Sequence, residues 1–200
     1  MLDNKAQRIE TARLIIRKYE IVDALLLKKS IDESIKHLRP WMPWAEQEPE
    51  PLEKKIERLT DFKSKFEANE DYAYGIFDKE ETKLIGGTGL HTRQGPKILE
   101  IGYWTNIHEI NKGYITESSY ALTKIAFEHI GIDKVEIRCD EKNLASARIP
   151  EKLGFKLEYK YRQHEFDAKG NRVVSKVYVL FKEEFKIIEK YDAIKFGLMS

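Results

Sequence analysis

One stretch of the sequence restricts the fold more than any other: a strand-like segment that leads through a short loop into the start of a helix. Residues 100–105 (EIGYWT) have the composition of a strand, and residues 111–117 (NKGYITE) place a lysine and a glycine before a helix-like pattern. A loop of this kind directs free backbone N–H groups and the positive end of a helix dipole toward one point. The sequence therefore predicts an anion-binding site at this junction.

A second motif follows about thirty residues further on. Residues 143–148 (NLASAR) and 151–155 (EKLGF) indicate a short helix with Asn143 as its N-cap, Ser146 in its first turn and a glycine at its end. Pro150 has no N–H, so the helical hydrogen bond to the Ser146 carbonyl cannot form. Together the two motifs favour an enzyme that holds a cofactor with a pyrophosphate group.

Composition excludes several classes of partner. The 200 residues are 42% hydrophobic and 34% charged, with a formal net charge of +1, as is usual for a globular protein. The near-neutral charge gives no general attraction to nucleic acid or to an anionic membrane. No repeat or low-complexity linker divides the chain, so we expect residues 1–200 to form a single domain.

Three features predict a cytoplasmic protein. The first five residues, MLDNK, contain no apolar run of the kind found in a signal peptide. No segment approaches the roughly 18 apolar residues of a membrane span. The single cysteine, Cys139, excludes an internal disulfide framework and fits a reducing compartment. It lies in an apolar run, where a buried strand thiol is the simplest interpretation.

Hydrophobic periodicity predicts a mixed α/β arrangement with two helices between the first and second strands. Asp23 is expected to cap the first helix, residues 46–50 to form an acidic surface loop, and the charged residues 182–200 to form a helix or a loose tail. The expected strands are 11–17, 72–78, 83–91, 99–105, 134–140, 155–163 and 173–181, the expected helices are 22–38, 51–66, 116–130 and 144–153, and residues 167–171 are the expected turn of the last hairpin.

This order of elements and motifs resembles the Gcn5-related N-acetyltransferase (GNAT) superfamily, and within it the bacterial branch that acetylates the N-termini of ribosomal proteins. The resemblance is carried by residues 11–17 (TARLIIR), 85–90 (IGGTGL), 100–104 (EIGYW), 112–117 (KGYITE), Asn143, Ser146 and 151–155 (EKLGF). It implies a mixed, mostly antiparallel twisted sheet of about seven strands flanked by about four helices. It also implies a splay between the fourth and fifth strands, and acetyl-coenzyme A as co-substrate.

The resemblance assigns cofactor contacts to both motifs. Lys112, Gly113 and Tyr114 are expected at the pyrophosphate, the backbone of 103–105 at the pantetheine amides and the oxyanion, and Asn143 at the pantetheine arm. Where the family loop has a polar residue first and a glycine or alanine last, this chain has isoleucines, yet backbone amides could still hold phosphate. The predicted cofactor-binding residues are Tyr103, Trp104, Thr105, Ile110, Asn111, Lys112, Gly113, Tyr114, Ile115, Thr116 and Asn143.

Acetyl transfer to an amine requires a proton acceptor, a donor for the oxyanion and stabilisation of the leaving thiolate. Glu100, at the head of an apolar strand beside the expected splay, is the candidate general base; the alternative is an ordinary ion pair at a strand end. Ser146 is the candidate hydrogen-bond donor to the coenzyme A sulfur; the alternative is a serine on a helix surface.

The expected acceptor is the α-amine of a protein N-terminus, ribosomal by resemblance, attacked directly in a ternary complex. Trp41, Trp44 and His91 are predicted to bind it, although core packing of the tryptophans is equally consistent with the sequence. His91 could also be a second acid–base group, but a polar strand end is the simpler interpretation. A small amine such as a polyamine or an aminoglycoside stays open because of the acidic run at 46–50, and so does a non-catalytic module that binds coenzyme A.

Two further expectations concern metals and assembly. The five histidines, His37, His91, His108, His129 and His164, have no ligand spacing, so no metal site is expected. An exposed strand of the last hairpin could pair with a second copy of the chain, so a homodimer is left open.

Overall fold

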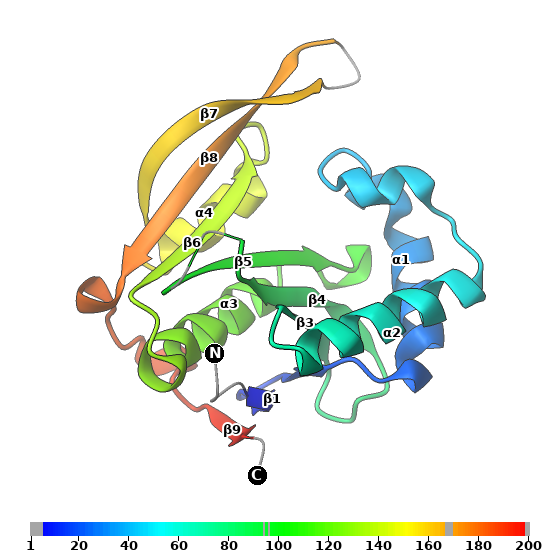
Figure 1. Cartoon of the computed structure of the whole chain (residues 1–200), viewed down its shortest axis with the longest axis horizontal. Helices are drawn as coiled ribbons and strands as arrows, with labels where there is room; N and C mark the ends of the chain where they lie inside the picture. The colour runs from blue at the N-terminus through cyan, green and yellow to red at the C-terminus, as the bar shows by residue number, and fades with distance from the viewer. Residues whose placement is uncertain (1–5, 94, 96, 167–169, 199–200) are drawn as a thin grey trace.

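A nine-stranded sheet organises the computed structural model, which describes residues 6–198 except 94, 96 and 167–169 (Figure 1). All neighbouring strands are antiparallel apart from β5 and β6, which are parallel. In spatial order the strands are β7 (Lys156–Phe166), β8 (Arg172–Phe181), β6 (Lys134–Asp140), β5 (Ile98–Thr105), β4 (Leu84–His91), β3 (Asp71–Phe77), β2 (Ile15–Lys18), β1 (Ala6–Glu10) and β9 (Lys195–Leu198).

Helices cover both faces of the sheet. On one face, α1 (Ala24–Leu38) and α2 (Leu52–Glu67) bury Leu27 and Leu59 against Phe77 of β3. On the other face, α3 (Tyr114–Ile125) and α4 (Leu144–Lys152) contribute to the larger core. A π-helical turn (Ala126–Ile130) continues α3 until the left-handed Gly131 (φ 76°) ends it, as the sequence predicts. None of the helices in the described ranges is long and apolar enough to span a membrane.

The expected splay lies between β5 and β6. Their pairing covers four positions, from Ile98 opposite Lys134 to Ile101 opposite Ile137. Beyond Ile101, β5 continues to Thr105 and β6 to Asp140, but the two strands no longer pair with each other. Figure 1 shows their ribbons separating. The backbone groups of β5 that face away from β4 therefore have no strand partner after Ile101.

The sheet has two strands more than the sequence predicts. The expected strand 11–17 is confirmed only at residues 15–17, in β2, because residues 11–14 form a turn that joins β2 to the additional strand β1. The Thr11 N–H donates to the Leu14 carbonyl and the Leu14 N–H donates to Thr11 Oγ1, both at 3.0 Å. The extra hydrogen bonds of the threonine hydroxyl favour a turn over an extended chain at this point.

The C-terminal segment supplies the other extra strand, so the expectation of a helix or a loose tail is wrong. β9 pairs with β1, and the segment before it packs on α3. The Ile188 N–H donates to the Tyr120 hydroxyl at 3.1 Å, and Asp192 pairs with Lys124. The expected hairpin turn 167–171 lies partly outside the described residues, which exclude 167–169.

Asp23 does not cap α1 with its side chain, contrary to expectation. It belongs to a capping box on the short 3-10 turn before α1 (Ile21–Asp23), in which its carboxylate accepts from the Glu20 N–H at 2.8 Å. The same carboxylate also binds the Arg17 guanidinium at 2.7 and 2.9 Å. It therefore joins β2 to the start of α1.

The acidic segment 46–50 is not simply a surface loop. After the 3-10 turn η2 (Pro43–Gln47), the Glu48 side chain is fully buried and pairs with the equally buried Lys55 of α2. Glu50 binds Lys55 at 2.9 Å and Arg58 at 2.7 Å. Cations from α2 thus pair with two of the three carboxylates, because the loop folds back over that helix.

We expect Lys55→Met to destabilise the protein strongly, because the Glu48 carboxylate would stay buried without its closest cation. Loss of one partner of a buried pair costs about 3 kcal/mol or more. The control is Lys54→Met, since Lys54 pairs with Glu57 on the exposed side of the same helix and should change stability little. Urea unfolding of both variants measures the difference; equal stabilities would contradict the buried pair.

Candidate active site

A cavity of about 610 Å³ lies where β5 and β6 separate, between the end of α1 and the first turns of α3 and α4. It brings together most of the residues that the sequence predicts at a cofactor, although they are up to 105 positions apart in the chain. The predicted residues that line it are Trp41, Tyr103, Trp104, Thr105, Ile110, Asn111, Gly113, Tyr114, Ile115, Thr116, Asn143 and Ser146. Glu100, Lys112, Trp44 and His91 do not line it.

The predicted anion-binding loop has the backbone geometry of such a site. Asn111 and Gly113 both have left-handed backbones (φ 61° and 79°), and α3 begins at the next residue, Tyr114. The first N–H groups of a helix have no partner within it, so they are free to bind an anion at the cavity wall. Ile115 packs into the core, which explains how this position can be apolar while its amide serves the loop.

Arg13 supports this loop from the β1–β2 turn, a contribution that the sequence analysis missed. Its guanidinium pairs with the buried Glu117 of α3 at 2.6 Å and donates to the Lys112 carbonyl at 3.0 Å. It also lies 4.6 Å from the centre of the Tyr114 ring. The partners are about 100 residues apart, so only the arginine of the TARLIIR motif could have indicated this contact.

The Lys112 side chain is engaged elsewhere. Its ammonium group binds Glu109 at 2.9 Å, and Lys83 binds the other oxygen of the same carboxylate at 2.9 Å. Burial alone would raise the pKa of Glu109, but the hydrogen bonds from both lysines outweigh it and lower that pKa. Lys112 therefore contributes its backbone to the loop, while Glu109 holds its side chain.

Ser146 lies at the centre of a hydrogen-bonded group next to the splay. Its N–H donates to Asn143 Oδ1 at 3.1 Å, which confirms Asn143 as the N-cap of α4. Its hydroxyl lies 3.1 Å from the Tyr103 hydroxyl, which also donates to the Ser146 carbonyl at 3.2 Å. That carbonyl is the one left without a helical donor by Pro150, so Tyr103 supplies the missing hydrogen bond.

Cys139 is a buried strand thiol, as the sequence predicts. Burial raises the pKa of its thiol, and the hydrogen bond with Ser146 lowers it only in part. The thiol is thus protonated near neutral pH, which argues against a nucleophilic role. Burial also raises the pKa of the Tyr103 hydroxyl, which keeps that group protonated as a donor.

Glu100 lies on the opposite face of β5 from Tyr103, because alternate residues of a strand point to opposite faces. Its carboxylate lies 3.3 Å from the Arg138 guanidinium and 3.8 Å from that of Arg93. His91 is directly across from it on β4 and hydrogen bonds to Asp71 at 2.7 Å. The ion pairs match the alternative interpretation of Glu100, and its role as a base stays a prediction.

The two tryptophans of the α1–α2 connection occupy different places. Trp41 lines the cavity and is 36% exposed. Trp44 packs edge-on against Trp104, with ring centres 6.1 Å apart, beside the core under α1 and α2. Trp41 is therefore placed to meet a ligand, whereas Trp44 supports Trp104 from behind.

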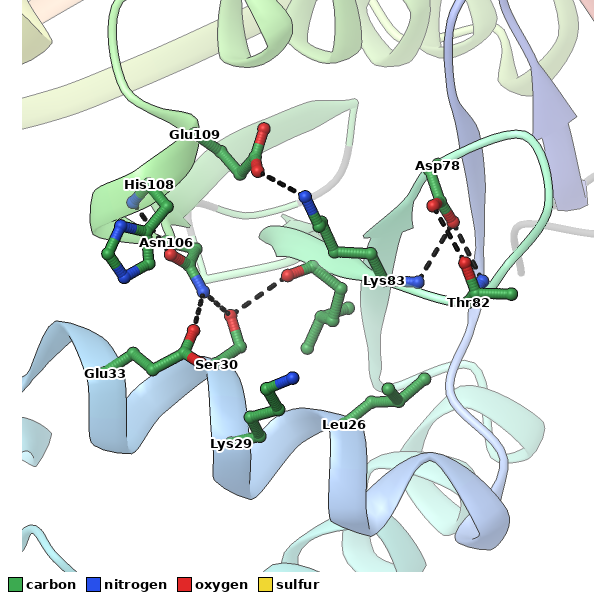
Figure 2. A pocket seen from close by; sticks show the side chains of 11 residues that line it. Leu26, Lys29, Ser30, Glu33, Asp78, Thr82, Lys83, Asn106, His108 and Glu109 are labelled. Atoms are coloured by element: carbon green, nitrogen blue, oxygen red, sulfur yellow. Dashed lines mark hydrogen bonds and ion pairs between the residues drawn. The ribbon is translucent and has the colours of Figure 1, made fainter.

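A second hollow of about 320 Å³ lies between α1, the β3–β4 hairpin and the segment after β5. Figure 2 shows its polar side chains bonded to one another: the Asn106 amide donates to Glu33 and Ser30, and Lys83 reaches Glu109. The hollow shares Glu109 with the main cavity. The hydrogen bonds among its side chains thus brace the segment that leads from β5 into the anion-binding loop.

Comparison with known proteins identifies the same family that the sequence motifs resemble. The family profile described as "Acetyltransferase (GNAT) domain" matches residues 13–156. The probable N-acetyltransferase YjcK of Bacillus subtilis (strain 168) is 30% identical over 109 residues, which cover 54% of this chain and 60% of YjcK. The chain therefore spans less than two thirds of that relative.

Solved structures match over more of their length. A crystal structure of a probable acetyltransferase superposes with a TM-score of 0.77 at 26% identity, covering 88% of this chain and 99% of the other. RimL, a ribosomal L7/L12 α-N-protein acetyltransferase in complex with coenzyme A, superposes with a TM-score of 0.76 at 21% identity, covering 86% and 98%. The latter identity supports a shared fold alone.

Substitution of the loop glycine should weaken cofactor binding. We expect Gly113→Asp to raise the Kd for acetyl-coenzyme A about tenfold or more, because the new carboxylate would add negative charge to the loop expected to hold the pyrophosphate. Gly131→Asp is the matched control: Gly131 has a similar left-handed backbone (φ 76°) at the other end of the same helix, so it imposes similar strain. Calorimetric titration compares them; equal loss in both variants would contradict the assigned site.

Proposed function

Because this chain belongs to the GNAT acetyltransferase family, we propose that it transfers the acetyl group of acetyl-coenzyme A to a primary amine. The cofactor's pyrophosphate would bind the N-terminal amides of α3 at the Asn111–Gly113 loop. Lys142, Arg148 and Lys152 line the same cavity and offer cations to its phosphate groups. The cavity thus provides a place for the charged end of the cofactor at α3 and α4.

The splay supports the position of the pantetheine arm. Beyond Ile101 the outward backbone groups of β5 have lost β6 as a partner, so they can pair with the amides of a ligand in the manner of an added strand. This orientation would bring the thioester carbonyl to the end of β5. A backbone N–H there could stabilise the oxyanion that forms during attack.

The group around Ser146 would serve the leaving thiolate. The amine nitrogen forms a bond to the acetyl carbon, the resulting tetrahedral intermediate breaks its C–S bond, and negative charge passes to sulfur. The Ser146 hydroxyl, which lies 3.1 Å from the Tyr103 hydroxyl, could turn its proton toward that sulfur. The proton lost by the amine needs a separate acceptor, for which Glu100 and His91 are the two candidates.

We further propose that the acceptor is the α-amine of a protein N-terminus, with ribosomal proteins as the first class to test. The charged residues that line the cavity favour a protein N-terminus over a polycation. These residues are three cations near α4 and Glu109, which two lysines already neutralise. At the end away from α4, Trp41 and Met42 offer an apolar lining, which suits the first side chain of a peptide better than a polycation.

The acidic run that motivated a polyamine or aminoglycoside acceptor supports that alternative less after folding. Glu48 and Glu50 are paired with Lys55 and Arg58, which leaves Glu46 as the exposed carboxylate of the run. RimL, which shares the fold, is described as a ribosomal L7/L12 α-N-protein acetyltransferase, so a protein N-terminus is the first acceptor to test.

A panel of acceptors tests the proposal. We expect thiol release from acetyl-coenzyme A with peptides that carry a free α-amine, and none with the same peptides after N-formylation. Spermidine and an aminoglycoside complete the panel. Faster turnover of either small amine than of every peptide would assign the protein to the alternative class. Tight binding of acetyl-coenzyme A with no turnover of any amine would leave the non-catalytic module.

We expect Ser146→Ala to lower kcat about 10- to 100-fold, the usual value of one hydrogen bond to a charged group. The Kd for acetyl-coenzyme A should change little, because the bond to sulfur strengthens only as charge develops. Tyr103→Phe should lower kcat less. Ser64→Ala, on the exposed side of α2, controls for loss of a hydroxyl. Steady-state kinetics decides; unchanged kcat in Ser146→Ala would remove this residue from the reaction.

A further inference from the structure

We infer that His91, held by Asp71, is the general base that takes the proton from the attacking amine. The inference rests on the proposed acetyl transfer. It concerns the face of β4 and β5 opposite Ser146 and Tyr103, where the sequence analysis placed Glu100 in this role.

Asp71 fixes the direction of the His91 ring. The two residues are opposite each other on β3 and β4, and Asp71 Oδ1 lies 2.7 Å from His91 Nδ1. An ionised carboxylate can only accept, so in the neutral imidazole Nδ1 carries the proton and Nε2 has the lone pair. A carboxylate that orients an imidazole in this way is the arrangement that prepares histidine to accept a proton elsewhere.

Two glycines give the ring its place. Gly89 of β4 and Gly102 of β5 are directly opposite each other. A Cβ atom on Gly89 would lie 2.9 Å from His91 Nε2, and one on Gly102 would lie 3.0 Å from the same atom. Any larger residue at either position would displace the imidazole. The ring therefore lies across both strands, with Nε2 over Gly102.

Gly102 is where β5 leaves β6. Pairing between these strands ends at Ile101, and Tyr103, whose hydroxyl meets Ser146, follows Gly102 directly. The His91 Nε2 atom thus lies on one side of the splay at the same level at which the predicted thioester-binding group begins on the other. His91 does not line the cavity itself, so this role requires the amine to approach the acetyl carbon from the Gly102 face, past Nε2.

The lone pair of Nε2 is available, whereas the Glu100 carboxylate is engaged. Among residues 6–198 as described, Nε2 has no hydrogen-bond partner, and it is not one of the buried polar atoms left without one. Glu100 forms ion pairs with Arg138 and Arg93. Proton transfer to Glu100 would cost both pairs their attraction, so His91 can accept the proton with less loss.

The proton balance of the step is complete without another reactant. As the amine nitrogen bonds to the acetyl carbon, its N–H proton passes to His91 Nε2, and Asp71 stabilises the resulting imidazolium. After the C–S bond breaks, the thiolate takes a proton from solvent or through Ser146. The imidazolium returns its proton to solvent before the next turnover. Glu100, on this face, would attract the amine into position without taking its proton.

Kinetics of matched variants tests the role of His91. With the peptide acetylated best in the panel above, we expect His91→Gln to lower kcat about 100-fold or more, the usual range for loss of a general base. Glu100→Gln should raise the KM for the peptide more than it lowers kcat. His129→Gln is the control, since the His129 ring packs at a tilt against Phe196 of β9 and not against the glycine pair.

Two readouts separate catalysis from a merely structural role. The acidic limb of the kcat/KM profile should disappear in His91→Gln, and added imidazole should restore part of the activity of His91→Ala. Asp71→Asn should lower kcat while leaving the Kd for acetyl-coenzyme A unchanged, because it removes the acceptor that sets the tautomer. Full activity of His91→Gln across the pH range would overturn the inference but leave acetyl transfer intact.

A measurement without turnover gives an independent answer. In ¹⁵N-histidine-labelled protein, the His91 signals, assigned with His91→Gln, should show a neutral ring with the proton on Nδ1 at the pH of maximal activity. Asp71→Asn should shift the tautomer. A ring with the proton on Nε2, or one that is charged at that pH, would overturn the inference. Absence of acetylation of every amine by the wild type would instead overturn the proposed function itself.

Discussion

The parting of β5 and β6 is the constraint on which the rest of this structure depends. Parallel pairing lasts for only four positions, so the backbone of β5 from Gly102 onward is held on one side alone. Unpaired backbone groups in a sheet require a partner, and the surrounding elements leave that position to a ligand. α3 and α4 start at the open side, so their first N–H groups and the exposed edge of β5 converge on one cavity.

Much of the site is built from backbone, and this explains both the success and the limits of the sequence analysis. The loop at Gly113 and the cap at Asn143 are local motifs, and the structure contains both where the sequence placed them. The strand 134–140 and the end of α3 at Gly131 were likewise correctly predicted, because periodicity and a left-handed glycine are short-range signals. Local chemistry sufficed in each of these cases.

Several features that the sequence analysis missed depend on contacts between distant segments. The Arg13–Glu117 pair joins residues 104 positions apart, whereas the burial of Glu48 depends on a loop that folds back over Lys55, 7 positions further along the chain. The strand β9 exists because β1 offers it an edge. The different partners of Glu100 and His91 also depend on such contacts, because Arg138 and Arg93 reach the Glu100 carboxylate whereas Asp71 reaches the His91 ring. No periodicity encodes such contacts.

Pro150 and Tyr103 illustrate how closely two such segments are tied. The proline leaves the Ser146 carbonyl without a helical donor, and the tyrosine hydroxyl on β5 occupies that place at 3.2 Å. An N–H at position 150 would compete with Tyr103 for the same oxygen and free its hydroxyl to turn away from Ser146. The two positions are therefore energetically coupled through one carbonyl oxygen, so the effects of substituting them on stability should not add.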